Sequence, residues 1–487
     1  MLFNSHEFIL AFLPATLLAF FIVARASELA ARVVLLGASF FFYAWWSVEY
    51  GLLIVATIVM NYGFGRALQH LASNRSQNAR HLLIVALAVN LGLLGYYKYR
   101  NFFIENLGAA LGFDWSLAPL VLPLAISFHT FQQIAYLVDS YRQKVEQPTL
   151  FSYALFVLFF PQLIAGPIVH HWQLLPQLHS RRMYRFDAES FAAGLTYFVL
   201  GLSKKVLLAD PLSSVADPIF DAAVAAPPTA TEAATATLAY TFGLYFDFSG
   251  YSDMAVGLAL MFGVRLPYNF NSPYRAASII DFWRRWHMTL SHWLRDYLYI
   301  PLGGSRHGPV RRHVNLMITM LLGGLWHGAA WSFMLWGALH GAFLIVNHAW
   351  NGLAARFAAA GRPIALPQPV AWGLTFGGVA LAWIFFRSPS LEHALAMLNG
   401  LVGSNGLHSE RLASAIGAGK GITLALAAGI ALLMPNTQQL IDGVGRSRRM
   451  PHLRWSPGRV WSTALAALFM LAFTQMSAVR EFVYFQF

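Results

Sequence analysis

The chain has 487 residues, of which 57% are hydrophobic and only 11% are charged. A soluble globular domain carries roughly 25% charged residues, so this composition excludes an ordinary soluble enzyme and predicts a polytopic membrane protein. The formal net charge of +12 does not indicate a nucleic-acid partner, because Lys and Arg lie in short loops between apolar runs. The chain has no cysteine and therefore no disulfide, thiolate metal ligand or cysteine nucleophile.

Apolar runs that could cross a bilayer recur along the whole chain. They lie at 8–24, 33–46, 52–64, 82–97, 117–138, 191–206, 238–262, 314–350, 370–386, 422–434 and 461–476. Several fall short of the roughly 20 residues that a straight spanning helix needs. We therefore expect tilted, broken or re-entrant helices, above all at 159–169 and 321–341, where Gly and Pro interrupt the apolar sequence. The predicted fold is an all-α bundle that forms one membrane domain, 1–487.

Basic loops predict the orientation of the chain. Lys and Arg follow the first, third and fifth apolar runs and gather again at 181–185, 306–312 and 446–459, whereas the loop 209–237 has none. Because cytoplasmic loops are enriched in Lys and Arg, we predict a multi-pass protein of the bacterial inner membrane with both termini in the periplasm. Lys98 and Arg100 are exceptions to this scheme. The run 8–24 has no basic residue before it, so we expect a span rather than a cleavable signal peptide.

Polar residues gather in three otherwise apolar stretches, the first made of 123–142 with 159–171, the second 245–295 and the third 323–340. Polar groups are costly inside a membrane and mark function by default. In the second stretch, Asp247 and Asp253 are expected to pair with arginines or to cap broken helices.

The end of this stretch, Asp281–Tyr297, predicts a basic, aromatic amphipathic helix on the cytoplasmic side of the membrane. One interpretation is a plain interfacial anchor. The other is that Arg284 and Arg285 meet an anionic donor while His287 lines a catalytic tunnel.

His327 is the strongest single candidate for catalysis. It lies between Trp326 and Gly328 in an apolar, glycine-rich run with no acidic neighbour. A neutral imidazole is a suitable general base near pH 7, although a histidine that bonds across two helices would give the same pattern. His287, His292 and His327 lack the spacing of known zinc motifs, so no metal site is predicted.

Several long motifs resemble the membrane-bound O-acyltransferase family. They read FFPQLIAGPIVHH, LYFDFSGYSDMAVG, LPYNFNSPYR, DFWRRWHMTLSHW and LGGLWHGAAW. The branch that is most similar O-acetylates alginate. The resemblance implies tilted helices around a transmembrane tunnel, with a catalytic core near 120–345, His327 as the catalytic histidine and His287 at a second catalytic position. Residues of the same motifs are then expected to line the tunnel or contact substrate, namely Trp326, Gly328, Arg284, Arg285, Trp286, Asn269 and Asn271.

The implied reaction takes an acetyl group from cytoplasmic acetyl-coenzyme A, with no permanently bound cofactor. The acetyl group passes across the membrane to an exopolysaccharide, alginate or cellulose-like, through a periplasmic partner protein. Two alternatives stay open at this point. They are a transporter of acyl groups without chemistry of its own, and a lipid or protein acyltransferase of another branch of the family.

The last residues, 480–487, read REFVYFQF and carry one hydroxyl nucleophile, Tyr484. An aromatic membrane-interface belt would explain them. They also resemble a tyrosine-containing C-terminal motif of envelope acylation systems, which implies that Tyr484 carries the acyl group transiently. A phenyl ester is chemically suited to this role, because the phenol pKa of about 10 leaves the ester activated.

Overall fold

The computed structural model describes residues 1–408, 410–443, 453–476 and 482. Every regular element in these ranges is a helix, which confirms the predicted all-α class. The chain divides into two compact units, and each is built from separate stretches of sequence. The first comprises Met1–Leu202, Tyr251–Tyr268 and the described residues of 457–486, and the second comprises Ser203–Gly250 and the described residues of 269–456.

The first unit holds the helices of the N-terminal part of the chain and the last helix. They are η1 Phe8–Phe12, α1 Leu13–Ala24, α2 Glu28–Ala44, α3 Val48–Ser73, α4 Asn78–Leu94, η2 Gly95–Tyr99, α5 Arg100–Leu111, α6 Ile126–Tyr141, α7 Leu150–Leu158, α8 Phe160–Leu163, α9 His171–Leu178, η3 Arg181–Tyr184, α10 Ala188–Ser203 and α21 Arg459–Thr474.

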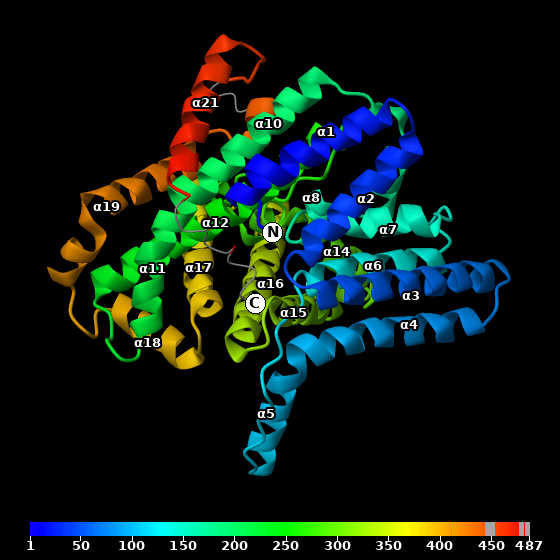
Figure 1. Cartoon of the computed structure of the whole chain (residues 1–487). Helices are drawn as coiled ribbons and strands as arrows, with labels where there is room; N and C mark the ends of the chain where they lie inside the picture. The colour runs from blue at the N-terminus through cyan, green and yellow to red at the C-terminus, as the bar shows by residue number, and fades with distance from the viewer. Residues whose placement is uncertain (409, 444–452, 477–481, 483–487) are drawn as a thin grey trace. The chain divides into compact units, whose positions relative to one another are not determined.

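Within this unit, α3, α4 and α6 pack side by side (Figure 1). Buried amides join them: Asn61 Nδ2 donates to Gln133 Oε1 at 2.7 Å, and Asn90 Nδ2 donates to Asn61 Oδ1 at 2.7 Å. Interhelical bonds of this kind hold helices together where apolar surface alone gives no preference for a partner.

The second unit contains the histidine motifs. Its helices are η4 Lys204–Ala209, α11 Asp210–Ala222, the first part of α12 Ala230–Met261, η5 Pro273–Arg275, α13 Ile279–Trp283, α14 Met288–Leu294, η6 Arg295–Tyr299, α15 Gly308–His327, α16 Trp331–Ala359, α17 Gln368–Arg387, α18 Leu391–Leu401, α19 Glu410–Leu433 and α20 Thr437–Ile441.

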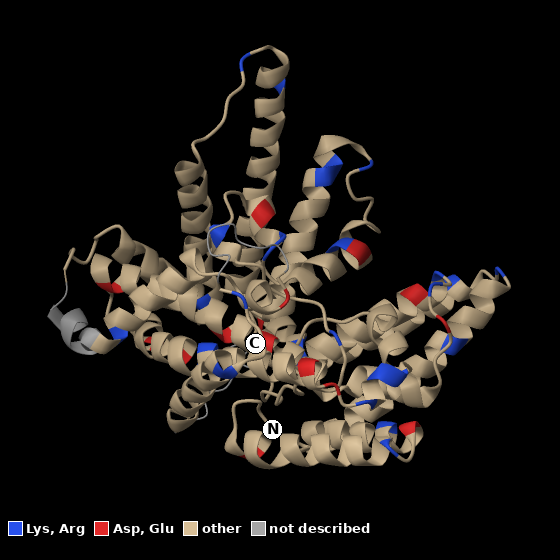
Figure 2. Ribbon diagram, turned by 90° about the horizontal axis from the view of Figure 1, so that it is seen from above, with Lys and Arg blue, Asp and Glu red and all other residues tan. Residues whose placement is uncertain are grey.

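Among the described residues, four continuous helices are long and apolar enough to cross a membrane. They are Val48–Ser73, Asn78–Leu111, Ala188–Ala222 and Gln368–Arg387. Shorter apolar helices lie at Phe8–Ala24, Gly419–Leu433 and Arg459–Thr474. Figure 2 shows long stretches of helix without a charged residue, as a multi-pass membrane protein requires.

The expected helix breaks are confirmed, and one predicted span is wrong. Helix α8 ends at Leu163 and no helix follows until His171, while α15 and α16 are separated by the three residues 328–330. The predicted span 117–138 is helical only from Ile126. Pro119 and Pro123 precede this point in sequence, and Ala125 has a left-handed backbone with φ of 61°. Neither feature is compatible with a regular helix.

Candidate active site

Helices α15 and α16 form a tight hairpin that places His327 at its turn. A Cβ atom added to Gly324 would collide with the carbonyl oxygen of Phe333, and one added to Gly337 would collide with the carbonyl oxygen of Met320. Small residues at such positions let two helix backbones approach closely. The hairpin geometry therefore depends on glycine at these positions.

His327 is the last residue of α15 and is 3% exposed. Its ring packs against Trp326, Trp336 and Phe386, with centroid distances of 4.9, 5.1 and 5.2 Å. The chain leaves the helix at Gly328, which has an extended backbone and no room for a side chain, because an added Cβ would overlap the Phe333 ring. His327 thus lies in an apolar, aromatic setting at a helix end.

His287 lies in a second helix break, and the predicted continuous helix Asp281–Tyr297 is wrong. Helix α13 ends at Trp283 and α14 begins at Met288, with His287 in the left-handed region at φ 41° and ψ 54°. His287 is fully buried and its ring meets Phe248 edge-on at 4.7 Å. An interfacial anchor would instead present its aromatic face to lipid.

The segment that begins at Asn269 explains this break. Asn269 accepts the backbone N–H of Met288 at 2.9 Å, and its side-chain oxygen accepts the Thr289 hydroxyl at 2.6 Å. The backbone N–H of Asn271 donates to the carbonyl oxygen of Arg285 at 2.9 Å. These bonds hold the chain on both sides of His287 and replace bonds of a continuous helix. Asn269 and Asn271 therefore shape the turn in which His287 lies.

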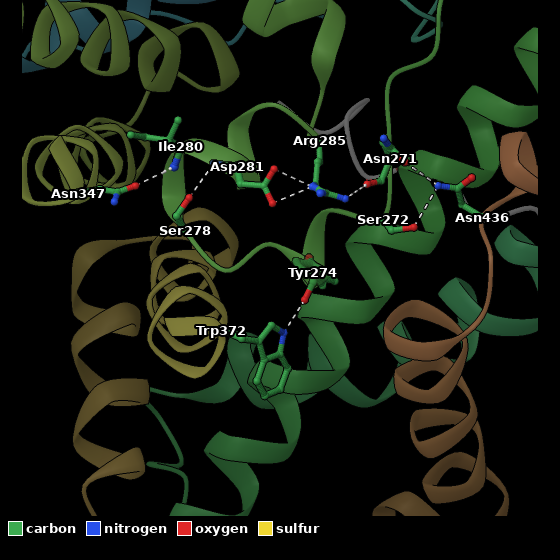
Figure 3. A network of polar contacts seen from close by, with 10 residues as sticks. All are labelled: Asn271, Ser272, Tyr274, Ser278, Ile280, Asp281, Arg285, Asn347, Trp372 and Asn436. Atoms are coloured by element: carbon green, nitrogen blue, oxygen red, sulfur yellow. Dashed lines mark hydrogen bonds and ion pairs between the residues drawn. The ribbon is translucent and has the colours of Figure 1, made fainter. Parts of the chain in front are cut away.

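The two predicted donor-binding arginines differ in their surroundings. The Arg285 Nε lies 2.9 Å from both carboxylate oxygens of Asp281, and its Nη1 donates to the carbonyl oxygen of Asn271 (Figure 3). Asn436 extends the network by donating to the Asn271 side chain and to Ser272, each at 3.0 Å. Arg284, the neighbouring residue, is exposed.

Trp326 lies between the two histidines. Its ring centroid is 4.9 Å from that of His327 and 6.3 Å from that of His287. Trp286 is 1% exposed and packs on Phe270 and Trp383 at 5.1 and 5.0 Å. Of the site residues predicted from sequence, the structure therefore brings His287, Trp326 and His327 into one aromatic cluster.

A third histidine, His340, was missed by the sequence analysis, although it closes the stretch 323–340. It is fully buried on α16, and its Nδ1 accepts the indole N–H of Trp283 at 3.2 Å. Its ring lies 4.9 Å from that of Trp336, which also contacts His327. Its spacing of four residues from Trp336 was the signal that could have placed both on one face of a helix.

Asp247 forms an ion pair with a lysine, not with an arginine as predicted. Its carboxylate lies 2.7 Å from the Nζ of Lys205, which also lies 2.9 Å from Asp210. The three groups form a buried ion cluster that joins α11 and α12 through η4. No group of three His, Cys, Asp or Glu side chains in the described parts of the chain is arranged to hold a metal ion.

Tyr484 lies outside the described residues. Phe482, two positions earlier in the same C-terminal motif, is 3% exposed and stacks on Tyr251 at 4.9 Å. Tyr251 belongs to α12 and stacks in turn on Phe3 at 4.9 Å. All three residues belong to the first unit.

The apolar helices define a multi-pass membrane protein, and two of its histidines, His287 and His327, are buried beside Trp326. The model of the membrane-bound O-acyltransferase (MBOAT) family matches residues 120–385, more than half of the chain, and the chain belongs to this family. It is therefore an acyltransferase, as the sequence motifs predict.

Curated relatives cover most of the chain. A peptidoglycan O-acetyltransferase of Helicobacter pylori is 44% identical over 84% of this chain and 81% of its own length. A probable alginate O-acetylase of Azotobacter vinelandii is 43% identical over 82% of this chain and 77% of its own length. A teichoic acid D-alanyltransferase of Streptococcus thermophilus is 28% identical over 47% of this chain and 57% of its own length.

Proposed function

We propose that this protein is an inner-membrane O-acetyltransferase that supplies acetyl groups from cytoplasmic acetyl-coenzyme A to an exopolysaccharide outside. The observation that carries the proposal is the burial of His327 against Trp326, whose ring also contacts His287. The chain is an acyltransferase, and its relatives are named O-acetyltransferase and probable O-acetylase. Alginate or a cellulose-like polymer is the first candidate acceptor. Peptidoglycan is the second, because the Helicobacter pylori relative carries that name at 44% identity.

In the proposed reaction His327 acts as general base. It accepts the proton of a hydroxyl group while the hydroxyl oxygen attacks the thioester carbonyl carbon. The carbon–sulfur bond then breaks, and the leaving thiolate takes up a proton, so the products are an acetate ester and a free thiol. Aromatic burial of His327 keeps bulk water from competing with the hydroxyl.

The donor's phosphates are proposed to meet Arg284. This arginine is exposed, whereas Arg285 is held by Asp281 and Asn271 in the network of Figure 3. Arg285 then contributes by fixing the turn that carries His287. Anionic membrane lipid is a second anionic group that the same basic segment would attract.

Acetyl transfer to the outside is proposed to use Tyr484 as a carrier. The phenol would take the acetyl group from the donor with help from His327, and a periplasmic partner protein would pass it to the polymer. The stacking of Phe482 on Tyr251 supports this proposal, because Phe482 lies only two positions before Tyr484 in the sequence.

The alternatives make different predictions. A transporter without chemistry would release no thiol, and membership of an acyltransferase family argues against it. A lipid or protein acyltransferase would yield an acetylated lipid or protein, and product analysis would identify it.

The decisive experiment is His327→Ala in the full chain. We expect acetylation of the polymer to fall by at least about 100-fold, because a positioned general base contributes on that order. The level of protein in the membrane should not change. His292→Ala is the matched control, since this histidine is exposed on the same motif. Normal acetylation by His327→Ala at equal protein level would refute the proposed role.

A further inference from the structure

Three buried polar side chains lie along one face of α16, the helix that follows His327 in the hairpin. Ser332, Trp336 and His340 are 2%, 1% and 0% exposed. Residues four apart in an α-helix differ by only about 40° around its axis. The three side chains, which we call the α16 stripe, therefore share one face and extend over about 12 Å of helix.

Each member of the α16 stripe has a polar atom without a hydrogen-bond partner among the described residues. These atoms are Ser332 Oγ, Trp336 Nε1 and His340 Nε2. Two side chains of the same types elsewhere in the unit do have partners. The Ser388 hydroxyl donates to the Ile384 carbonyl oxygen at 2.7 Å, and the Trp372 indole donates to the Tyr274 carbonyl oxygen at 2.9 Å.

Buried polar groups are normally hydrogen-bonded, because the loss of water is otherwise uncompensated. Three such atoms on one helix face therefore indicate a bound species that supplies partners. The chemistry of the stripe indicates what that species offers.

His340 can only donate from its free nitrogen. Its Nδ1 accepts the indole N–H of Trp283 at 3.2 Å, so Nδ1 carries no proton and the proton of the neutral ring lies on Nε2. Trp336 Nε1 is likewise a donor, and the Ser332 hydroxyl can donate as well. The stripe thus offers hydrogen-bond donors, and its ligand must supply the acceptors.

The surroundings of the stripe are apolar. The Trp336 ring contacts those of Trp283, Trp383 and Phe386 at 6.0, 5.7 and 5.1 Å, and it contacts His327 at 5.1 Å. None of the stripe residues is charged. The ligand that fits is elongated and uncharged, carries several hydrogen-bond acceptors, and reaches His327.

We propose that the α16 stripe binds the pantetheine arm of the thioester donor. This arm is an uncharged chain whose amide and thioester carbonyl oxygens accept hydrogen bonds, and it joins the reacting sulfur to the distant phosphates. The proposal rests on the proposed acetyltransferase function, and it adds the residues that recognise the middle of the donor. Phosphate recognition is assigned to a different place, the exposed Arg284.

The test compares two donors on the purified full-length protein in lipid nanodiscs. Acetyl-coenzyme A carries the arm and the phosphates, whereas acetyl-pantetheine carries the arm alone. Ser332→Ala and Trp336→Phe should each raise the KM for both donors about 3- to 10-fold, as expected for one lost hydrogen bond, with a smaller effect on kcat. Arg284→Glu should raise the KM for acetyl-coenzyme A only.

Ser388→Ala and Trp372→Phe are the matched controls, because they remove a hydroxyl and an indole N–H that already bond to backbone carbonyl oxygens. They should leave both KM values unchanged. If the stripe variants behave like these controls, the stripe binds only water and the proposal is wrong. A fall in kcat at constant KM would also overturn it, because it would indicate a structural role.

Two substitutions of His340 test the roles of its two ring nitrogens separately. Glutamine places an amide N–H near the position of Nε2, whereas asparagine places its amide near Nδ1. We expect His340→Gln to preserve the KM for acetyl-pantetheine better than His340→Asn. The reverse order would show that only the bond from Trp283 matters.

Failure of the proposed function gives a different result. In that case the wild-type protein releases no thiol from either donor. Calorimetric binding of acetyl-pantetheine needs no turnover, so it tests the stripe variants independently of the reaction.

Discussion

His287 has a backbone that most residues avoid. A left-handed conformation costs an ordinary L-residue roughly 1–2 kcal/mol, whereas glycine and asparagine adopt it readily. The strain at φ 41° is maintained by the bonds from Asn269 and Asn271 on either side. A residue held in this way at a buried site is a candidate for function.

Substitutions of His287 by residues that tolerate a left-handed backbone distinguish a catalytic role of its imidazole from a structural one. His287→Gly relieves the strain and removes the imidazole, so we expect a stable protein with acetyl transfer reduced by about 100-fold. His287→Asn keeps a polar side chain and should retain more activity than His287→Gly. Activity and melting temperature should be measured together on the purified variants. If activity simply follows melting temperature, His287 is a structural residue.

Tyr484→Phe tests whether the phenolic oxygen of Tyr484 carries the acetyl group. The change keeps an aromatic ring for a membrane-interface belt and removes only the phenolic oxygen. We expect polymer acetylation to be lost while donor binding remains. Phe482→Ala is a useful companion, because it removes the stacking on Tyr251 and leaves Tyr484 intact. Full acetylation by Tyr484→Phe would leave the belt as the role of this residue.

At the scale of elements, the sequence predicted that helices would break but not how the broken ends are held. Glycine and proline marked the breaks at 159–169 and 321–341, because these residues end helices for local reasons. The break before His287 has no such residue, since it depends on contacts with a segment some 20 positions away. Asn269 bonds to Met288 and Thr289, and local periodicity contains no information about such contacts.

The hairpin of α15 and α16 depends on its glycines in a way that can be measured. In Gly337→Ala the new methyl group would collide with the Met320 carbonyl oxygen, so we expect a loss of about 1–3 kcal/mol in stability. Gly352→Ala on the same helix meets no atom within 4 Å and should be neutral or slightly stabilising. Thermal unfolding of the two purified variants compares them. Equal melting temperatures would contradict the tight packing.

The catalytic roles of His327 and His287 stay predictions, although the structure buries both beside Trp326. The residues that support the candidate site were missed by the sequence analysis. His327 and His287 stood out because imidazole is rare in apolar sequence. His340 resembled any polar residue of a buried helix in the sequence. Its proposed role depends on the hydrogen bond from Trp283, which lies 57 positions away. The assignment of both arginines to one role overlooked Asp281, four residues before Arg285 and within reach on one helical turn.

At the scale of the whole molecule, the absence of cysteine allows a direct test of orientation. Ala226 lies in the loop predicted to be periplasmic, and Ser305 lies in the basic loop predicted to be cytoplasmic. Both residues are exposed. In whole cells, a membrane-impermeant thiol reagent should label Ala226→Cys and not Ser305→Cys. Both should be labelled after the membrane is opened, and the opposite pattern would reverse the predicted topology.

The hairpin that carries His327 also constrains how the protein is made. Neither α15 nor α16 is among the four helices in the described part of the chain that are long and apolar enough to cross a membrane. Helix α17 is one of these four, and its Trp383 and Phe386 pack on Trp336. Since ribosomes synthesise α15 and α16 first, the nascent hairpin reaches the insertion machinery before the helix that shields it. Chains that stop between α16 and α17 would therefore lack a firm membrane anchor for the hairpin, and quality-control proteases would find its histidines exposed.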